Sequence, residues 1–358
     1  MINKKRLIII LAVLAGLLAV FFTSERLWNF FNNSAVQELS FQKGISYRLE
    51  NYNKDILFIN NEEIKSISPA GDEIWSSVTG LSNPGVCVSG DYVLIYDLKG
   101  TTALLFKNNK LVKKVSVENS ILSANINKKG YFAIATDEVG YKGMVTVYSP
   151  SFKEIYRWHS GSGYIAELDI SPENHLAVSQ INTDGEQLIS RVLLFNIKNN
   201  KEKECLKREN ILVSDIKFYD NESFTALSDT DMFGFTSGGN LKYNVNFGGR
   251  SLIYYNIENM HNLVLAFKGN VNNTILESYS NTGKLRGSFD APGDIGSADV
   301  NGEVILITSQ RSLYSILPSG KLKFKREMKN EISSVKIYSS RRKAVLIGGN
   351  NVLLYDIH

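Results

Sequence analysis

The residues of this chain that are best suited to binding a metal ion are scattered. Its four histidines, His159, His175, His261 and His358, lie far apart in the sequence. Structural metal sites typically draw their ligands from short, regular spacings. The stretch Asp229–Asp231 begins like a calcium-binding loop, but Met232 and Phe233 follow where further oxygen ligands are needed. We therefore expect no metal site.

The two cysteines point neither to a disulfide framework nor to a nucleophile. Cys87 and Cys205 are widely separated, and Cys87 stands between Val86 and Val88 as a small buried hydrophobic residue would. The chain also shows no recognisable set of nucleophile, general base and orienting acid. The sequence therefore predicts a protein that is not an enzyme and uses no cofactor.

The charge balance argues against nucleic acid as a partner. The chain has 40 Lys and Arg against 36 Asp and Glu, a formal net charge of +4, and Lys4, Lys5 and Arg6 supply most of that excess. A nucleic-acid-binding surface is strongly and locally basic. We therefore expect no nucleic-acid binding.

An unbroken apolar run follows the basic triplet, from residue 7 to residue 22. With the two residues after it, the run approaches the length of about 20 residues that spans a bilayer. Basic residues keep the end before such a segment in the cytoplasm. We predict a cytoplasmic N-terminus at 1–6, a transmembrane anchor at 7–24 and a short tether at 25–35. The remainder is then extracytoplasmic, on a single-pass protein of the cell membrane.

A cleaved signal peptide is the alternative reading of this segment. Signal peptidase requires small residues just past the apolar core. Phe21 and Phe22 occupy that region, and Trp28 beyond them suits a membrane interface. The sequence therefore favours a retained anchor.

From residue 36 onward the chain repeats one unit of about 41 residues. Short runs rich in Val, Ile, Leu, Tyr and Phe alternate with clusters of Gly, Asn, Ser and Asp, the pattern of strands and turns. The third strand of each unit ends on a large apolar residue, namely Ile67, Phe106, Tyr148, Phe195, Phe235, Tyr279, Ile316 and Tyr355. Four short strands at this period are typical of a β-propeller blade. We predict an all-β, eight-bladed β-propeller, with seven blades as the runner-up. A β-sandwich would explain the strands but not the period.

The two ends of the repeat region complement each other. The eighth unit stops at Tyr355–His358, directly after its third strand, and so lacks an outermost strand. The alternating segment 36–42 has no place in the first unit. We expect this segment to supply the missing strand, because that pairing removes an open sheet edge and closes a propeller domain at 36–358.

Loops that join one unit to the next are the expected place for a binding surface, since loops on a rigid scaffold carry most binding residues. Arg250, Asp294 and Glu331 are charged residues of such loops, and Tyr254 is an aromatic residue nearby. We predict that these four residues contribute to a binding rim around the central channel. The expected partner is another envelope protein.

Turn motifs of the repeat resemble those of a known superfamily. The stretches Ser68–Trp75 and Pro318–Leu322 are similar to blades of the eight-bladed quinoprotein-like and WD40-like propellers, some of which are non-enzymatic assembly scaffolds. The adjacent cysteines of quinone-cofactor enzymes and the Asp-box of sialidases are not found in the sequence. Tyr355-Asp356 only loosely resembles the Trp-Asp strand ending of WD40 repeats.

The whole chain, with its basic N-terminus, one apolar segment and a Tyr-, Asn- and Lys-rich repeat region, is similar to domain-of-unknown-function family 5711 of clostridial-type bacteria. This resemblance implies no catalytic residues. We expect a non-catalytic, membrane-anchored extracytoplasmic β-propeller that acts as a protein–protein interaction scaffold in the bacterial cell envelope. The alternative is a binder or sensor of an envelope ligand such as a glycan, although Trp75 and Trp158 lie in outermost strands, where packing is their expected role.

Overall fold

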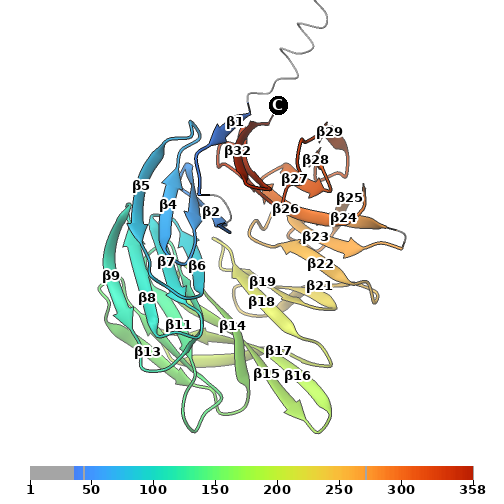
Figure 1. The fold of residues 1–358 in the computed structure, drawn as a ribbon. Helices are drawn as coiled ribbons and strands as arrows, with labels where there is room; N and C mark the ends of the chain where they lie inside the picture. The colour runs from blue at the N-terminus through green and yellow to red at the C-terminus, as the bar shows by residue number, and fades with distance from the viewer. Residues whose placement is uncertain (1–35, 43–44, 271, 358) are drawn as a thin grey trace, which may run out of the picture.

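A computed structural model describes residues 36–42, 45–270 and 272–357. The predicted anchor at 7–24 and tether at 25–35 lie outside these ranges. Within them, eight four-stranded antiparallel sheets are arranged as blades around a central axis (Figure 1). No helix in the described ranges is long and apolar enough to cross a membrane. The prediction of an all-β, eight-bladed propeller is confirmed.

Each of the first four blades consists of consecutive strands, ordered from the channel outward. Blade 1 contains β2 (Arg48–Tyr52), β3 (Asp55–Ile59), β4 (Glu63–Ile67) and β5 (Glu73–Val78). Blade 2 contains β6 (Pro84–Ser89), β7 (Tyr92–Asp97), β8 (Thr102–Lys107) and β9 (Lys110–Ser116). Blade 3 contains β10 (Ile121–Ile126), β11 (Phe132–Thr136), β12 (Met144–Tyr148) and β13 (Glu154–His159). Blade 4 contains β14 (Tyr164–Ile170), β15 (His175–Asp184), β16 (Gln187–Asn196) and β17 (Lys201–Glu209).

Blades 5 to 7 follow the same order, whereas blade 8 combines both ends of the repeat region. Blade 5 contains β18 (Val213–Phe218), β19 (Phe224–Ser228), β20 (Asp231–Phe235) and β21 (Leu241–Asn246). Blade 6 contains β22 (Leu252–Asn256), β23 (Leu263–Lys268), β24 (Asn273–Tyr279) and β25 (Leu285–Pro292). Blade 7 contains β26 (Ile295–Asn301), β27 (Val304–Ser309), β28 (Ser312–Ile316) and β29 (Leu322–Glu327). Blade 8 contains β30 (Ser334–Ile337), β31 (Lys343–Gly348), β32 (Asn351–Asp356) and, outermost, β1 (Gln37–Leu39).

The burial of a strand depends on its place in the blade. The second strands β3, β11 and β19 are buried along their whole length, because both of their faces pack against neighbouring blades. The outermost strands β5, β21 and β29 alternate between exposed and half-buried residues. In β29 three of the four exposed residues, Lys323, Lys325 and Glu327, are charged, which is typical of a strand with one face in solvent.

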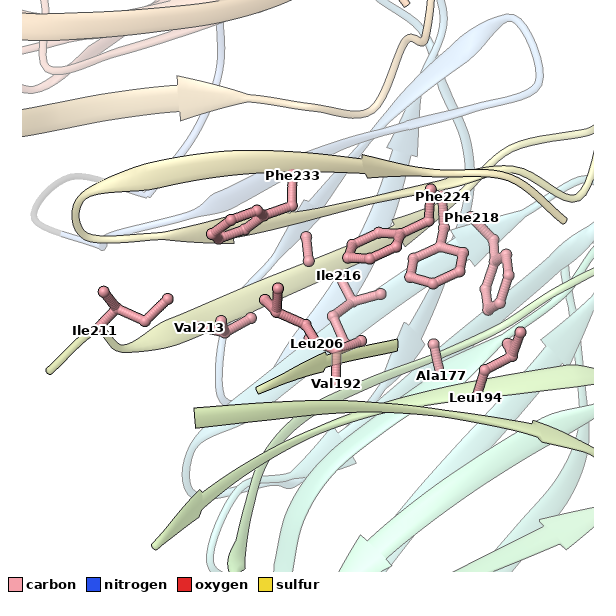
Figure 2. Packing of buried hydrophobic residues seen from close by; sticks show 12 residues of the cluster. Ala177, Val192, Leu194, Leu206, Ile211, Val213, Ile216, Phe218, Phe224 and Phe233 are labelled. Carbon is pink, nitrogen blue, oxygen red and sulfur yellow. The ribbon is translucent and has the colours of Figure 1, made fainter. Parts of the chain in front are cut away.

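The hydrophobic core is divided among the blade interfaces. Eight clusters of buried side chains are found in the described residues, and each cluster joins two neighbouring blades. Figure 2 shows the cluster between blades 4 and 5, in which Val192 and Leu206 of blade 4 face Phe224 and Phe233 of blade 5. A single blade cannot bury both of its faces, so each one depends on its neighbours for stability.

Blade 8 closes the ring. β1 pairs with β32 in an antiparallel register of Gln37 with Leu354 and Leu39 with Val352. Leu39 then packs in the cluster between blades 8 and 1, together with Phe58 and Tyr338. The paired strand has three residues, fewer than the alternating segment 36–42.

The turns after the third strands contain glycines that the packing of neighbouring blades requires. In blade 6 the register shifts between Ser278 and Tyr279, and the turn that follows places Gly283 at φ 72°. A Cβ atom at Gly283 would lie 2.6 Å from the ring of Tyr243, in the neighbouring blade. Glycine is therefore required there both by its backbone conformation and by the close packing of the next blade.

The propeller has two distinguishable faces. On one face, which we call the crossover face, each outermost strand ends, the chain crosses to the next blade, and the second and third strands of each blade are joined. In blade 4 the second and third strands pair at ten positions, from His175 with Asn196 to Asp184 with Gln187, whereas four to six positions pair in the other blades. This hairpin therefore extends further on the crossover face than its counterparts (Figure 1).

Candidate functional site

The central channel encloses a cavity of about 540 Å³ to which all eight innermost strands contribute. Charged residues dominate its lining: Arg48, Glu50, Glu167, Asp215, Lys217, Glu258, Asp299 and Lys336. Most of these residues belong to innermost strands in which polar and apolar residues alternate, such as Asp215-Ile216-Lys217-Phe218 in β18. The lining of the channel is therefore strongly polar.

Each of the three cationic residues in the channel lining pairs with a carboxylate. Lys336 Nζ lies 3.2 Å from Glu50 Oε2 and 3.7 Å from Asp299 Oδ1, so this lysine of blade 8 joins blades 1 and 7. Lys217 Nζ lies 2.5 Å from Glu258 Oε2, and Arg48 Nε lies 3.1 Å from Glu50 Oε1. These charges are mutually satisfied within the protein.

Two buried aspartates also fasten neighbouring blades together. Asp169 Oδ2 accepts the backbone N–H of Phe218 at 2.6 Å, and Asp299 Oδ2 accepts that of Ile337 at 2.7 Å. In both cases the acceptor strand belongs to one blade and the donor strand to the next. These hydrogen bonds connect neighbouring blades, so both aspartates stabilise the fold.

Burial governs the protonation of the channel carboxyls. It raises the pKa of Asp169 to about 7 and that of Asp215 to about 7, and the nearby Glu167 adds to the shift at Asp215. Burial alone would lower the pKa of Lys217, but Glu258 and Asp169 outweigh it and raise that pKa. Glu258 is exposed to the channel space, whose surrounding walls oppose its ionisation, yet the charge of Lys217 leaves its pKa lowered.

A second hollow, which we call the crevice, lies between blades 3 and 4. It has a volume of about 310 Å³ and is lined by residues of β13, β15, β16, β17 and the crossing between β13 and β14: Trp158, His159, Gly161, Ser162, Gln180, Arg191, Leu193, Glu202 and Glu204. Strand alternation explains the lining, because Leu176, Val178 and Gln180 lie on the same face of β15. The first two of these belong to the core cluster between blades 3 and 4, and the third continues their row into the crevice.

The side of the crevice nearest the core is apolar. The ring of Trp158 packs on that of Phe195 with centroids 4.8 Å apart, and both belong to the packing between blades 3 and 4. Towards the crossover face the lining becomes polar, and the apolar packing ends. The crevice is therefore a gap in an interface that is well packed elsewhere.

Polar atoms in the crevice lack the partners that the channel charges have. Gln180 is 2% exposed, and its Nε2 donates to Ser160 Oγ at 2.6 Å, but its Oε1 makes no hydrogen bond. His159 Nδ1 and Arg191 Nε are also buried without a hydrogen bond, although Arg191 Nε lies 3.4 Å from Glu204 Oε2. Buried polar groups are nearly always hydrogen-bonded, so a group of such atoms in one place requires an explanation.

Two exposed aromatic side chains, Tyr141 and Tyr164, stand next to the crevice, and the exposed Val139 lies in the same loop as Tyr141. Val139 is 90% exposed, Tyr164 58% and Tyr141 50%. The Tyr141 ring lies 4.6 Å from the imidazole of His159, and Lys142 Nζ donates to the Tyr164 hydroxyl at 3.0 Å. Exposed apolar side chains that lie together are candidates for an interaction surface.

Of the four residues predicted to form a channel rim, two are occupied in packing. Arg250 forms an ion pair with Glu277, with Nη1 2.7 Å from Oε1, and its guanidinium stacks 3.9 Å above the Phe267 ring. Tyr254 is half-buried in the cluster between blades 6 and 7, and burial raises its pKa.

Asp294 and Glu331 are exposed in the crossings that follow blades 6 and 7. None of the four predicted residues contributes to the lining of the channel cavity. Their role in binding stays a prediction.

The sequence contained signals for the residues that were missed. Ile216-Lys217-Phe218-Tyr219 and Val335-Lys336-Ile337-Tyr338 share one pattern, and each tyrosine donates its hydroxyl to a backbone carbonyl of the next blade. In blade 4, Gln180 and Arg191 interrupt apolar runs of unusually long strands. Neither pattern predicts whether a polar side chain forms a hydrogen bond or an ion pair within the protein.

The residues considered for metal binding lie as follows. In the described part of the chain, no group of three or more His, Cys, Asp or Glu side chains is placed to hold a metal ion. Asp231 accepts hydrogen bonds from Asn246 and Thr230 at the start of β20. Cys87 and Cys205 are unpaired thiols, and burial raises both of their pKa values, that of Cys205 to about 11.

Comparison with known proteins gives one family and many structures of the same shape. The family described as "Family of unknown function (DUF5711)" matches residues 26–354. No curated protein matches the sequence.

Three solved structures illustrate the similarity of shape. The computationally designed Ika8 protein has a TM-score of 0.66 at 10% identity, over 89% of this chain and 98% of that one. The C-terminal WD40 domain of Sif2 has a TM-score of 0.64 at 12% identity, over 90% and 98%. BamB from Moraxella catarrhalis has a TM-score of 0.56 at 10% identity, over 90% and 100%. At such identities the likeness concerns the fold alone.

Proposed function

From the premise that this chain belongs to the DUF5711 family of unknown function, we propose that it is a non-catalytic protein–protein interaction scaffold, anchored in the membrane and placed outside the cytoplasm. The observation that carries this proposal is the group of exposed apolar side chains, Val139, Tyr141 and Tyr164, beside the crevice. A rigid propeller that presents apolar groups on one face is suited to recognising another protein.

The contrast between the two hollows supports this choice of surface. The channel is larger, but its lysines and its arginine are paired with carboxylates that belong to the fold. A partner entering the channel would have to compete with those pairs. Three buried polar atoms of the crevice make no hydrogen bond in the described structure, against one, Asn51 Oδ1, in the channel lining, and exposed apolar side chains lie near the crevice.

The direction of β1 indicates which face of an anchored propeller would lie nearer the membrane. β1 runs antiparallel to β32 and occupies the outermost position of blade 8, so its first residue lies on the face opposite the crossover face. In a ring of eight blades, blade 4 also lies across the axis from blade 8. A membrane anchor that precedes β1 would therefore leave the crossover face, with the crevice, directed away from the bilayer.

The location is tested with a cysteine introduced on the surface. Val78 is 79% exposed at the end of β5, and a Val78→Cys variant of the full chain offers an accessible thiol. We expect a membrane-impermeant maleimide to label this variant in intact cells, and the protein to fractionate with membranes. Labelling only after permeabilisation would contradict the extracytoplasmic placement.

The interaction is tested by photo-crosslinking in the same cells. A photoreactive amino acid at Val139 is expected to capture one recurrent protein, because this side chain is highly exposed next to the crevice. The matched control site is Val78, a valine of similar exposure on blade 1. The captured protein, once purified, should bind the full-length chain directly. Equal capture at both positions, or none at either, would contradict the scaffold function.

A further inference from the structure

We infer that the crevice between blades 3 and 4 binds an extended peptide segment of the partner, one that carries a basic side chain close to an apolar side chain. This inference rests on the proposed function and adds to it the place and the chemistry of the contact. It is argued from the unpaired atoms, the charges and the exposed side chains of the crevice.

The carboxamide of Gln180 is a buried acceptor that lacks its donor. Its Nε2 donates to Ser160 Oγ at 2.6 Å, and Ser160 Oγ in turn donates to the backbone oxygen of Gly163. This chain of bonds favours the orientation in which Nε2 faces Ser160 and Oε1 lacks a donor. Because an unpaired buried acceptor is destabilising, we attribute its presence here to a donor that the partner brings.

Arg191 supplies the complementary group. Gln180 and Arg191 stand directly opposite each other in β15 and β16, and side chains of such pairs are about 5 Å apart at their Cβ atoms. Arg191 Nε is a donor without a hydrogen bond, and Gln180 Oε1 is an acceptor without one. A peptide backbone carries one N–H and one C=O per residue, so an extended segment can satisfy both.

Entry requires a side chain to move, because these atoms are buried in the free protein. Arg191 has the weakest contacts in the crevice, at 3.3 Å from Ser162 Oγ and 3.4 Å from Glu204 Oε2. Rotamer changes of this kind are common when a partner binds to a rigid backbone. Arg191 is therefore the side chain that opens the crevice.

The charges and apolar groups of the crevice define the side chains of the partner. Glu202 and Glu204 face a single arginine in the lining, and Glu202 is exposed with no ion pair among the described residues. A Lys or Arg of the partner complements this excess carboxylate. The exposed aliphatic side chain of Val139 favours an apolar side chain of a protein. A sugar ring would require an open aromatic face, whereas the exposed rings of Tyr141 and Tyr164 already contact His159 and Lys142.

The test uses the full-length protein in lipid nanodiscs and a display library of short random peptides. We expect selection to enrich peptides that contain Lys or Arg near an apolar residue. For the best of them, Gln180→Leu and Glu202→Lys should each weaken binding at least about tenfold, as expected for groups at the centre of a contact. Glu202 is exposed, so its charge reversal keeps the fold intact even if the Gln180 variant does not.

The matched control is Asp294→Lys, an equal charge reversal in an exposed crossing elsewhere on the crossover face. Peptide binding that responds to Asp294→Lys and not to the crevice variants would overturn this inference but leave the scaffold function in place. If no peptide binds while chitotetraose does, and Gln180→Leu abolishes that binding, a glycan is the occupant and both proposals fail. If neither probe binds, the peptide inference fails, and the photo-crosslinking at Val139 decides the scaffold function by itself.

Discussion

The two faces of blade 4 differ in how their polar side chains are satisfied. On the face towards blade 5, Ser179 Oγ donates to the backbone oxygen of Val213 at 2.7 Å, and Ser190 Oγ donates to that of Ile211 at 2.7 Å. On the face towards blade 3, Gln180 and Arg191 retain atoms that make no hydrogen bond. Both faces use residues of the same two strands, β15 and β16.

This difference separates the polar groups that hold the propeller together from those that are available to a partner. A satisfied buried hydrogen bond stabilises the fold, whereas an unsatisfied buried group costs free energy. The interface with blade 5 is dense, with the rings of Phe224 and Phe235 stacked 4.6 Å apart within its cluster. The interface with blade 3 opens into the crevice.

The largest effect is expected from the core of the blade 5 side. Phe224→Ala should lower the free energy of unfolding by about 4 kcal/mol, because a fully buried ring is replaced by a cavity. Trp158→Ala on the blade 3 side should cost less, about 2 kcal/mol, because that ring is half-buried. Urea denaturation of both variants measures the two values. An equal or larger cost for Trp158→Ala would show that the two interfaces are equally tight.

A pH-dependent effect is expected at the channel end of the blade 5 side. The pKa of Asp169 is about 7 in the folded chain and about 3.9 in an unfolded one, so the folded state holds more protons between these values. Its contribution to the free energy of unfolding therefore falls as the pH rises through that window, and it is constant above it. Asp169→Asn removes this contribution, so its stability relative to the wild type should increase by at most about 3 kcal/mol from about pH 4.5 to pH 7.

Urea denaturation across this pH range measures the effect. The control is Ser214→Ala, which changes an uncharged residue of the channel lining and should follow the wild-type profile at every pH. A constant difference between Asp169→Asn and the wild type would contradict the raised pKa of Asp169.

A smaller effect is expected from one hydroxyl on the blade 5 side. Ser190 Oγ also accepts the backbone N–H of Val213 at 3.3 Å, so Ser190→Ala leaves two backbone groups without this partner. The free energy of unfolding should fall by about 1 to 2 kcal/mol. Hydrogen exchange at the Val213 amide should become faster. If hydrogen exchange and stability are both unchanged, the polar groups on the face towards blade 5 are no better hydrogen-bonded than those on the face towards blade 3.

The smallest effect on stability is expected in the crevice. Gln180→Leu removes an unpaired acceptor and one hydrogen bond to Ser160, and these changes oppose each other. The free energy of unfolding should stay within about 0.5 kcal/mol of the wild type, although peptide binding is lost. Thermal unfolding in matched buffer measures this. A loss above about 2 kcal/mol would reveal that Gln180 Oε1 already has a partner within the protein.

Much of the fold could be predicted from the sequence because its signals are local. Each third strand, its polar turn and its glycine lie within a few residues of one another, as at Tyr279 and Gly283, and the period repeats them. The first unit is preceded by a spare strand, and the last unit lacks its outermost strand. Together these two features predict the pairing that β1 makes with β32. These features need no knowledge of which blade touches which.

The candidate sites could be predicted only in part, because their contacts are distant in the sequence. Lys336 and Glu50 are 286 positions apart and meet only when the ring closes. Arg250 was predicted as a rim residue from its place in a loop, but its pairing with Glu277 and stacking on Phe267 depend on the packing of blade 6. Charge and loop position alone do not show whether a charged side chain is paired within the protein or free to contact a partner.

The sequence by itself therefore determined the strand class, the number of blades and the turns, since strand alternation, turn chemistry and period are properties of neighbouring residues. The tertiary structure decided which polar groups are satisfied. Gln180 and Ser190 are both polar residues that neighbour apolar ones, and only the arrangement of blades 3, 4 and 5 leaves Gln180 Oε1 without a hydrogen bond and gives Ser190 Oγ two. The physical reason is that hydrogen bonding of a blade surface depends on the neighbouring blade, which lies elsewhere in the chain.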